Sequence, residues 1–263
     1  MTRRSSAALA LALLAGPGAV AGQEVVTGFV DRTVSAGGRQ QRYQVYVPAE
    51  YPGAGRWPVI LFLHGAGERG TDRLLPTAVG LAPAIRQNPR RFPAIVVFPQ
   101  VPPDSQWVGA PAEVAMLALR RTLREFQVDS TRVYLTGLSM GGHGVWYLAY
   151  RYPEVFAAAV PICGWVTELP RFRGSVPVVP DADSAAALAA LARRLARLPL
   201  WIFHGEMDPV VPVIASRAPA AALQPLSTVV RYTEYLGLGH DVWDAVYASD
   251  AFTRWLFAQR RPF

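Results

Sequence analysis

The sequence predicts an α/β fold, with a mostly parallel sheet covered by helices on both faces. Three observations indicate this fold. Short apolar runs alternate with amphipathic segments along most of the chain, as in repeated strand–helix units. The chain has 263 residues and 51% of them are apolar, which is enough for one large core. No segment recurs at a fixed period, which argues against a solenoid or a propeller.

The expected strands differ in how deeply they should be buried. Residues 42–47 alternate polar and apolar side chains, as expected for an edge strand. Residues 59–63 read Val-Ile-Leu-Phe-Leu, a continuous apolar run typical of a central strand that is buried on both faces. The remaining expected strands cover residues 94–98, 133–136, 157–162, 200–203 and 228–235.

Helices are expected between and after these strands. Residues 113–126 carry apolar side chains at helical spacing, with arginines between them. Residues 170–183 are rich in Pro, Arg and Asp and should form a loop, and Asp183 or Ser184 should cap the helix that follows it. Pro219 should interrupt one helix late. The other expected helices cover residues 142–150, 184–198, 213–223 and 243–259.

The first 21 residues have the three parts of an export signal. Arg3 and Arg4 supply positive charge, residues 7–15 are an uninterrupted apolar run, and residues 19–21 read Ala-Val-Ala, a typical cleavage site. The apolar run is too short to span a bilayer. We therefore expect a signal peptide at 1–21, one α/β domain at 22–263, and a secreted or periplasmic protein without stable membrane insertion. A buried N-terminal helix is the alternative.

Charge and cysteine content exclude further classes of protein. The formal net charge is +7, and all basic residues are arginines scattered in short groups. A nucleic-acid-binding protein would cluster them on one element, so no nucleic-acid partner is expected. Cys163 is the single cysteine, so the fold has no internal disulfide although an exported protein could form one.

Residues 137–141, Gly-Leu-Ser-Met-Gly, match the Gly-x-Ser-x-Gly pattern of a nucleophile elbow. An expected strand precedes the motif and an expected helix follows it. Gly137 and Gly141 allow close backbone packing where a Cβ atom would clash. The turn should lift the hydroxyl of Ser139 above the sheet, at the positive end of the helix. We expect Ser139 to be the nucleophile, and an ordinary glycine-rich turn is the alternative.

A serine hydroxyl is a poor nucleophile at neutral pH and needs a base, and the sequence contains four histidines. His240 alone lies both C-terminal to the acid candidates and on a glycine-bearing loop just after the last expected strand. We therefore expect His240 to be the base. His64, His143 and His204 are expected to be structural, with His64 and His204 bracing their loops through hydrogen bonds.

A carboxylate should orient the base and stabilise its cation. Asp208 follows a strand and lies between the nucleophile and the base in sequence, so it is the expected acid. Glu206 is the competitor, although the acid normally lies deeper into this turn. Asp241 and Asp244 follow the base and are better explained as charges at the start of a helix.

Residues 63–70, Leu-His-Gly-Ala-Gly-Glu-Arg-Gly, follow a central strand, where a donor of an oxyanion hole is expected. We assign the two donors to the backbone amides of Ala66 and Met140. Each donor would stabilise the tetrahedral intermediate by roughly 3 kcal/mol. A glycine-rich turn without a ligand is the alternative.

Several motifs in order resemble the dienelactone-hydrolase and esterase-D-like branch of bacterial α/β-hydrolases, which includes predicted peptidases and phospholipase/carboxylesterases. The resemblance spans nearly the whole mature chain and rests on residues 63–70, 106–108, 137–142, 161–164, 204–212 and 235–244. Feruloyl and polyhydroxybutyrate-type esterases are more distantly similar. The resemblance implies hydrolysis of carboxylic esters with no cofactor. Residues 170–198 depart from it, because this segment is longer than expected for the branch.

Three tryptophans fall just after an expected strand or catalytic loop, at the edge where the site should form. We expect Trp107, Trp165 and Trp243 to line the substrate pocket, since aromatic walls suit an acyl or aromatic group. Packing in the core is the alternative for each. Trp107 is the strongest candidate, because it sits in a proline-rich loop with no expected helix to pack against.

The sequence therefore predicts a secreted serine hydrolase that cleaves carboxylic esters through an acyl-enzyme intermediate. Its partner would be a small-molecule or polymer-derived ester, and no metal site is expected. A serine peptidase that uses the same residues is one alternative. A non-catalytic binding protein on this fold is another, which the chemically competent triad and oxyanion positions disfavour.

Overall fold

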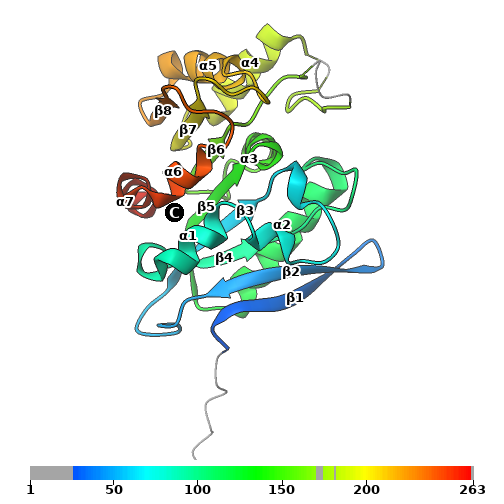
Figure 1. The fold of residues 1–263 in the computed structure, drawn as a ribbon, viewed down its shortest axis with the longest axis vertical. Helices are drawn as coiled ribbons and strands as arrows, with labels where there is room; N and C mark the ends of the chain where they lie inside the picture. Colours follow the sequence, from blue (N-terminus) through cyan, green and yellow to red (C-terminus); the bar gives the residue numbers. More distant parts are fainter. Residues whose placement is uncertain (1–25, 170–173, 181, 262–263) are drawn as a thin grey trace, which may run out of the picture.

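The computed structural model describes residues 26–169, 174–180 and 182–261 (Figure 1). The expected signal peptide at 1–21 lies outside the described residues. An eight-stranded sheet runs through the molecule in the order β1-β2-β4-β3-β5-β6-β7-β8. Its strands are β1 (Gly28–Ala36), β2 (Arg39–Val47), β3 (Trp57–Leu63), β4 (Ile95–Phe98), β5 (Val128–Leu138), β6 (Ala158–Ile162), β7 (Leu200–Gly205) and β8 (Val230–Tyr235).

The sheet is parallel from β4 to β8 and antiparallel at one end. The β1–β2 hairpin pairs with β4 in antiparallel fashion, and each later pair in the sheet is parallel. The expected mostly parallel α/β fold is thus confirmed. β2 contains the expected edge strand 42–47, but β1 pairs along its whole length, so that strand lies one position inside the edge. The position of β2 between β1 and β4 explains why its last five residues are all buried.

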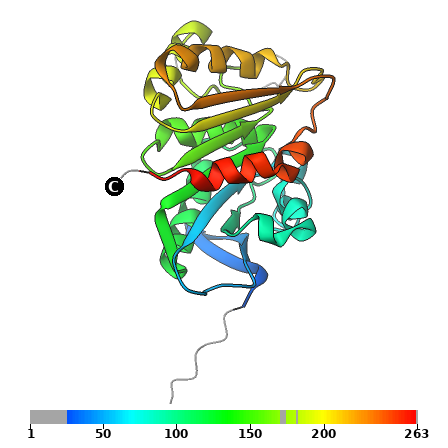
Figure 2. The same ribbon diagram turned by 90° about the vertical axis from the view of Figure 1, so that its left-hand side faces the viewer.

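Helices cover both faces of the sheet and create two cores (Figures 1 and 2). One face packs against α2 (Gly109–Glu125), α3 (Met140–Arg151), α4 (Ser184–Leu195) and α5 (Ile214–Leu223). The other packs against α1 (Leu81–Gln87), α6 (Trp243–Ala248) and α7 (Asp250–Ala258). Side chains of β3 alternate between the cores, with Leu61 in the first and with Ile60 and Phe62 in the second. This alternation explains the continuous apolar run of a central strand.

Two helices are interrupted or continued differently from the sequence expectation. Residues 243–259 form two helices, because Ser249 adopts an extended conformation and its hydroxyl caps α7 by accepting a hydrogen bond from the amide of Phe252. Pro219 does not end α5, which continues to Leu223 with the proline ring buried. Asp183 caps α4 through the amide of Ala186, as one of the two expected caps.

Within the described part of the chain, no helix combines the length and the apolar character needed to cross a membrane.

The candidate functional residues gather along one edge of the sheet. Ser139 follows β5, Asp208 follows β7 and His240 follows β8, and these parallel strands end at the same edge (Figure 1). Loops at the carboxyl edge of a parallel sheet commonly form ligand sites.

Candidate active site

Ser139 forms the whole connection between β5 and α3. β5 ends at Leu138 and α3 begins at Met140. The backbone of Ser139 adopts φ 54° and ψ −118°, a conformation that is rare for residues other than glycine. Its amide donates to the carbonyl of Ile162 (2.8 Å), and its carbonyl accepts from the amide of His143 (3.0 Å). The strained turn is therefore held from both sides, as a nucleophile elbow requires.

The two glycines of the elbow allow it to pack against the end of β3. A Cβ atom on Gly137 would lie 2.6 Å from the carbonyl oxygen of Leu63, and one on Gly141 would overlap the same carbonyl. This close approach brings the loop after β3 beside the elbow. The sequence expectation for Gly137 and Gly141 agrees with these contacts.

Ser139, His240 and Asp208 form one continuous hydrogen-bonded chain. The Nε2 atom of His240 lies 2.9 Å from the Oγ atom of Ser139, and its Nδ1 atom lies 2.6 Å from Oδ2 of Asp208. Because a carboxylate only accepts, the proton on the neutral imidazole lies on Nδ1, and Nε2 is free to accept the serine proton. The structure thus brings together the three residues that the sequence singled out.

Asp208 is buried in this chain and remains ionised. Burial acts to raise the pKa of Asp208, but hydrogen bonds from His204, His240 and the Val211 amide outweigh it and hold the pKa well below its usual value. Its Oδ1 atom accepts from the amides of Val210 (2.8 Å) and Val211 (2.9 Å). A charged carboxylate therefore faces His240 across the physiological range of pH.

The other acid candidates make different contacts. Glu206 accepts a hydrogen bond from the amide of Gly237 (2.9 Å) and so links the β7 and β8 loops. Asp244 lies in the first turn of α6, and burial together with the charge of Asp241 raises its pKa. These placements agree with the expectation that Asp208, and not its neighbours, faces the base.

The loops that carry the expected oxyanion donors are adjacent. Met140 is the first residue of α3, and Ala66 begins a short 3-10 helix, η1 (Ala66–Glu68). A Cβ atom on Gly65 would lie 3.7 Å from the Cβ atom of Ser139, so the η1 loop passes directly over the elbow. This arrangement leaves Ala66 and Met140 as the candidate donors.

Arg69 is a site residue that the sequence reasoning did not identify. Its Nε atom donates to the carbonyl of Ser105 (2.6 Å), and its guanidinium contacts Sδ of Met140 (3.1 Å). Arg69 therefore links the η1 loop to the loop at Ser105 and to the start of α3. The Glu-Arg pair inside a glycine-rich loop was the available sequence signal.

Two histidines brace the site in neutral form. His64 accepts from the amide of Val101 (3.1 Å) and donates from Nδ1 to the carbonyl of Gly65 (2.6 Å), which agrees with the bracing role expected for it. His143 hydrogen bonds to the carbonyl of Trp165 (2.9 Å). Burial lowers the pKa of His64 and the pKa of His143 to about 4, so both rings are uncharged near neutral pH.

The structure corrects the expectation for Trp107. Its side chain is 0% exposed, and its Nε1 atom donates to the carbonyl of His64 (2.9 Å). Gly144 of α3 makes room for it, because a Cβ atom there would overlap the Cβ atom of Trp107. Trp107 does have a helix to pack against, and it belongs to the core beneath the site instead of the pocket wall.

The other two expected pocket tryptophans differ from each other. Trp165 is 5% exposed, and its ring stacks on His143 with centroids 4.7 Å apart, so it is also a packed residue. Trp243 is partly exposed and presents an edge-to-face contact to His240 with centroids 5.3 Å apart. Of the three, Trp243 lies at the candidate site.

Among the described residues, one cluster has the composition of a metal site. Donor atoms of Cys163, His204 and Asp208 lie within 4.8 Å of one another. Each already makes hydrogen bonds: the Cys163 thiol donates to the carbonyl of His240 (3.2 Å), and burial raises its pKa, so it stays protonated. Metals bind the thiolate, so this cluster fits a hydrogen-bonded support for His240 better than a metal centre.

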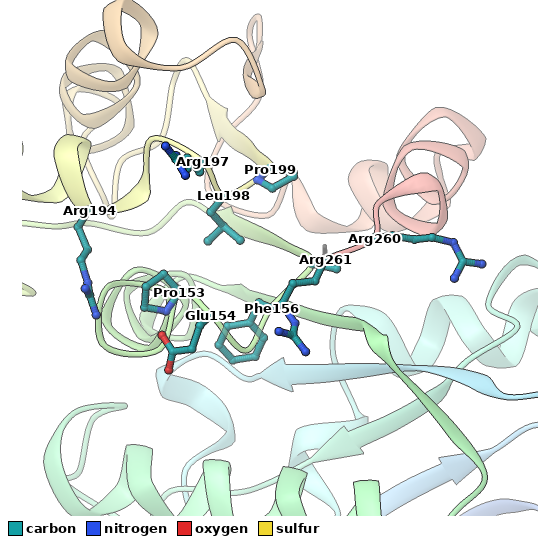
Figure 3. Close-up of a pocket in the computed structure, with 10 residues that line it drawn as sticks. Pro153, Glu154, Phe156, Arg194, Arg197, Leu198, Pro199, Arg260 and Arg261 are labelled. Atoms are coloured by element: carbon teal, nitrogen blue, oxygen red, sulfur yellow. The ribbon is translucent and has the colours of Figure 1, made fainter. Parts of the chain in front are cut away.

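A cavity of about 330 Å³ lies at the opposite edge of the sheet (Figure 3). Its walls come from the segments that precede β6 and β7 and from the chain after α7, and they include Arg194, Arg197, Arg260 and Arg261. The triad follows the carboxyl ends of the strands, whereas this cavity lies at their amino ends. It is therefore separate from the candidate active site.

Comparison with known proteins defines the class of this chain. The fold and the Ser–His–Asp contact are those of a serine hydrolase with the α/β-hydrolase fold. The family model "Putative esterase" matches residues 119–258, and the chain belongs to this esterase family. The matched segment contains all three residues of the candidate triad.

Three relatives illustrate the similarity. A thermostable esterase of known structure has a TM-score of 0.75 and 33% identity, covering 89% of this chain and 63% of the esterase. A feruloyl esterase module from Clostridium thermocellum, complexed with sinapinate, shares the fold at 16% identity, with a TM-score of 0.66 and 87% of each chain covered. An uncharacterised secreted protein of Arthroderma benhamiae is 26% identical over 208 residues, which cover 70% of this chain and 21% of that protein. The chain thus spans about a fifth of the length of this secreted relative.

Proposed function

We propose that this protein is an exported serine esterase that hydrolyses carboxylic esters through an acyl-enzyme intermediate. The observation that carries the proposal is the unbroken chain from Ser139 Oγ through His240 to Asp208, with contacts of 2.9 and 2.6 Å. Membership of the esterase family favours an ester over other acyl substrates.

In acylation, the Oγ atom of Ser139 attacks the ester carbonyl while Nε2 of His240 accepts the hydroxyl proton. The amides of Ala66 and Met140 would stabilise the negative oxygen of the tetrahedral intermediate. The bond between the carbonyl carbon and the alcohol oxygen then breaks, and His240 returns its proton to the departing alcohol.

In deacylation, a water molecule attacks the carbonyl carbon of the acyl-enzyme, and His240 accepts a proton from this water. The bond to Ser139 Oγ breaks, the serine recovers its proton from His240, and the carboxylic acid leaves. Asp208 remains ionised throughout and stabilises the imidazolium that forms in each half-reaction. Trp243, which contacts His240 edge-on, would provide an apolar wall beside the reacting carbonyl.

The test combines labelling with turnover. A fluorophosphonate should label the wild-type protein on Ser139, and Ser139→Ala should lose both the label and the ester turnover while remaining folded. A panel of p-nitrophenyl esters, feruloyl esters, acetylated sugars and p-nitroanilide peptides should show turnover of esters. Labelling with turnover of the anilides alone would indicate a peptidase, and absence of labelling would indicate a binding protein.

Export is the second part of the proposal. The charged start, the short apolar run and the Ala-Val-Ala site within residues 1–21 support it, and one relative is a secreted protein. Sequencing the N-terminus of exported protein should show cleavage at or near Ala21. An intact Met1 on exported, folded protein would contradict the proposal.

A further inference from the structure

The imidazole of His204 has no role in the mechanism above, yet it lies beside the candidate acid. His204 is in β7, four residues before Asp208, and its side chain is completely buried. Its Nε2 atom lies 3.1 Å from Oδ2 of Asp208. This is the same oxygen that binds Nδ1 of His240. Two histidines therefore share one carboxylate oxygen.

The surroundings of His204 fix which nitrogen carries its proton. Besides Asp208, Nε2 faces the carbonyl oxygen of Val211 (2.9 Å), and both of these oxygens can only accept. Nε2 therefore carries a proton. Nδ1 lies 2.7 Å from the hydroxyl of Ser216, which is also buried and can donate to it. Ser216 and Val211 thus hold the neutral ring in the tautomer that donates toward Asp208.

Both carboxylate oxygens of Asp208 have close contacts. Its Oδ1 atom accepts from two backbone amides, and its Oδ2 atom lies 2.6 Å from Nδ1 of His240 and 3.1 Å from Nε2 of His204. The backbone amides fix the carboxylate in the loop, whereas the two imidazoles share the charge on the oxygen that serves the base. His204 can therefore influence His240 without touching the substrate.

Other charged or titratable groups also surround this pair. The carboxylate of Glu234, in the β8 position paired with His204, forms an ion pair with Arg217 of α5. The remaining groups are the thiol of Cys163 at the end of β6 and the carboxylate of Asp241 after β8.

We infer that His204 is a positioning residue, held by Ser216, that sets the strength of the contact between Asp208 and His240. The inference rests on the proposed function, since it assigns a role within the same triad. The N–H group of His204 draws part of the charge of Oδ2 away from His240. Without it, the full charge of that oxygen would face His240, and protonated His240 would be bound more tightly.

The expected consequence has a definite sign. Tighter binding of the imidazolium makes His240 harder to deprotonate, so the acid limb of the profile of kcat/KM against pH should move to higher pH. Loss of this N–H contact, which Oδ2 shares with the Val211 carbonyl, should change the apparent proton dissociation constant about threefold to tenfold, a shift of roughly half to one pH unit. The kcat value should fall as well, because the proton is returned to the alcohol less readily.

Two variants at one position separate this role from a structural one. His204→Leu removes both hydrogen-bonding nitrogens and keeps an apolar side chain in the core. His204→Gln keeps an amide N–H group where Nε2 stands, and it is the matched control. The two readouts are the pH profile of kcat/KM and the NMR titration of the His240 ring in the free enzyme. The His240 ring signal is assigned as the one that is missing from the spectrum of His240→Gln.

Support for the inference is an upward shift of half to one pH unit in both readouts for His204→Leu, with His204→Gln close to wild type. A folded His204→Leu protein with an unshifted His240 titration would overturn it, and so would an equal shift in His204→Gln. If His204→Leu does not fold, Ser216→Ala carries the test, with a smaller shift expected in the same direction and no shift overturning the inference. The NMR titration needs no turnover, so wild-type protein that hydrolyses no ester would contradict the proposed function alone.

Discussion

At the scale of single residues, the backbone of Ser139 has a positive φ of 54°, although serine has a Cβ atom that disfavours this region. The strain is sustained by hydrogen bonds from both sides of the turn and by close packing of the elbow against β3. Strain at a candidate nucleophile is consistent with its function, because the turn exposes the hydroxyl where an ordinary helix start would not.

The strain predicts different stabilities for two inactive variants. Ser139→Gly should be more stable than Ser139→Ala by about 1 kcal/mol, because glycine adopts a positive φ freely and alanine does not. Urea unfolding of the two purified variants measures the difference directly. Equal stability, or a more stable alanine variant, would show that the turn is not strained.

A second prediction concerns the acid. Asp208→Asn should reduce kcat by about 10⁴-fold, because an amide can donate to Nδ1 of His240 and favour the wrong tautomer. Glu206→Gln is the matched control, since its amide oxygen can still accept from Gly237, and it should change kcat by only a few-fold. Steady-state kinetics on one ester decides between them, and a larger loss for Glu206→Gln would identify it as the acid.

At the scale of elements, α3 connects the candidate nucleophile, Ser139, to the core. Its first turn packs on β3 through Gly141, and its second turn packs on Trp107 through Gly144. Trp107 in turn binds the carbonyl of His64, at the end of β3. This layer supports the elbow and the η1 loop together, so its loss should act on the stability of the fold before it acts on specificity.

Trp107→Ala should therefore behave as a core substitution. It should reduce the free energy of unfolding by about 3–5 kcal/mol. The ratio of kcat/KM for a large ester to kcat/KM for a small ester should stay unchanged. Trp243→Ala is the contrasting variant: it should cost little stability and lower that ratio, because Trp243 is partly exposed beside His240. A changed ratio in Trp107→Ala, without loss of stability, would return Trp107 to the pocket.

The parallel strands and the residues of the candidate triad could be predicted from the sequence because local patterns specify them, whereas β1 and α1 were not predicted. Apolar runs marked the parallel strands, and the order of Ser139, Asp208 and His240 after three of them placed the triad at one edge. The environment of Trp107 could not be predicted, because it depends on a missing Cβ atom on Gly144, far along the chain. The shared contact of His204 with Asp208 could not be predicted for a similar reason, since it depends on how the β7 loop folds back on its own strand.

At the scale of the whole molecule, two buried neutral histidines link stability to pH. Burial lowers the pKa of His64 and of His143 to about 4 from an ordinary value of 6.5. Between these values the unfolded chain binds more protons than the folded one, so stability is fully present above about pH 6.5 and falls as the pH decreases toward 4. Each histidine contributes on the order of 3 kcal/mol to this loss.

Urea unfolding at pH 7.5, 6 and 5, followed by tryptophan fluorescence, measures this loss. His143→Gln is the control, because it removes one of the two titrating rings and should reduce the slope of stability against pH by about half. A free energy of unfolding that stays constant from pH 7.5 to 5 would contradict the assignment of buried neutral histidines.

The position of β8 has a consequence for the time at which activity can first arise. Ser139 and His240 are 101 residues apart in sequence, and His240 follows β8, the last strand in sequence among the described residues. A newly made chain whose sheet still ends at β7 can hold Ser139 in its turn, but it has no imidazole to activate it. Under the proposed function, hydrolysis requires β8 to be docked, so turnover during refolding should not precede the docking of β8.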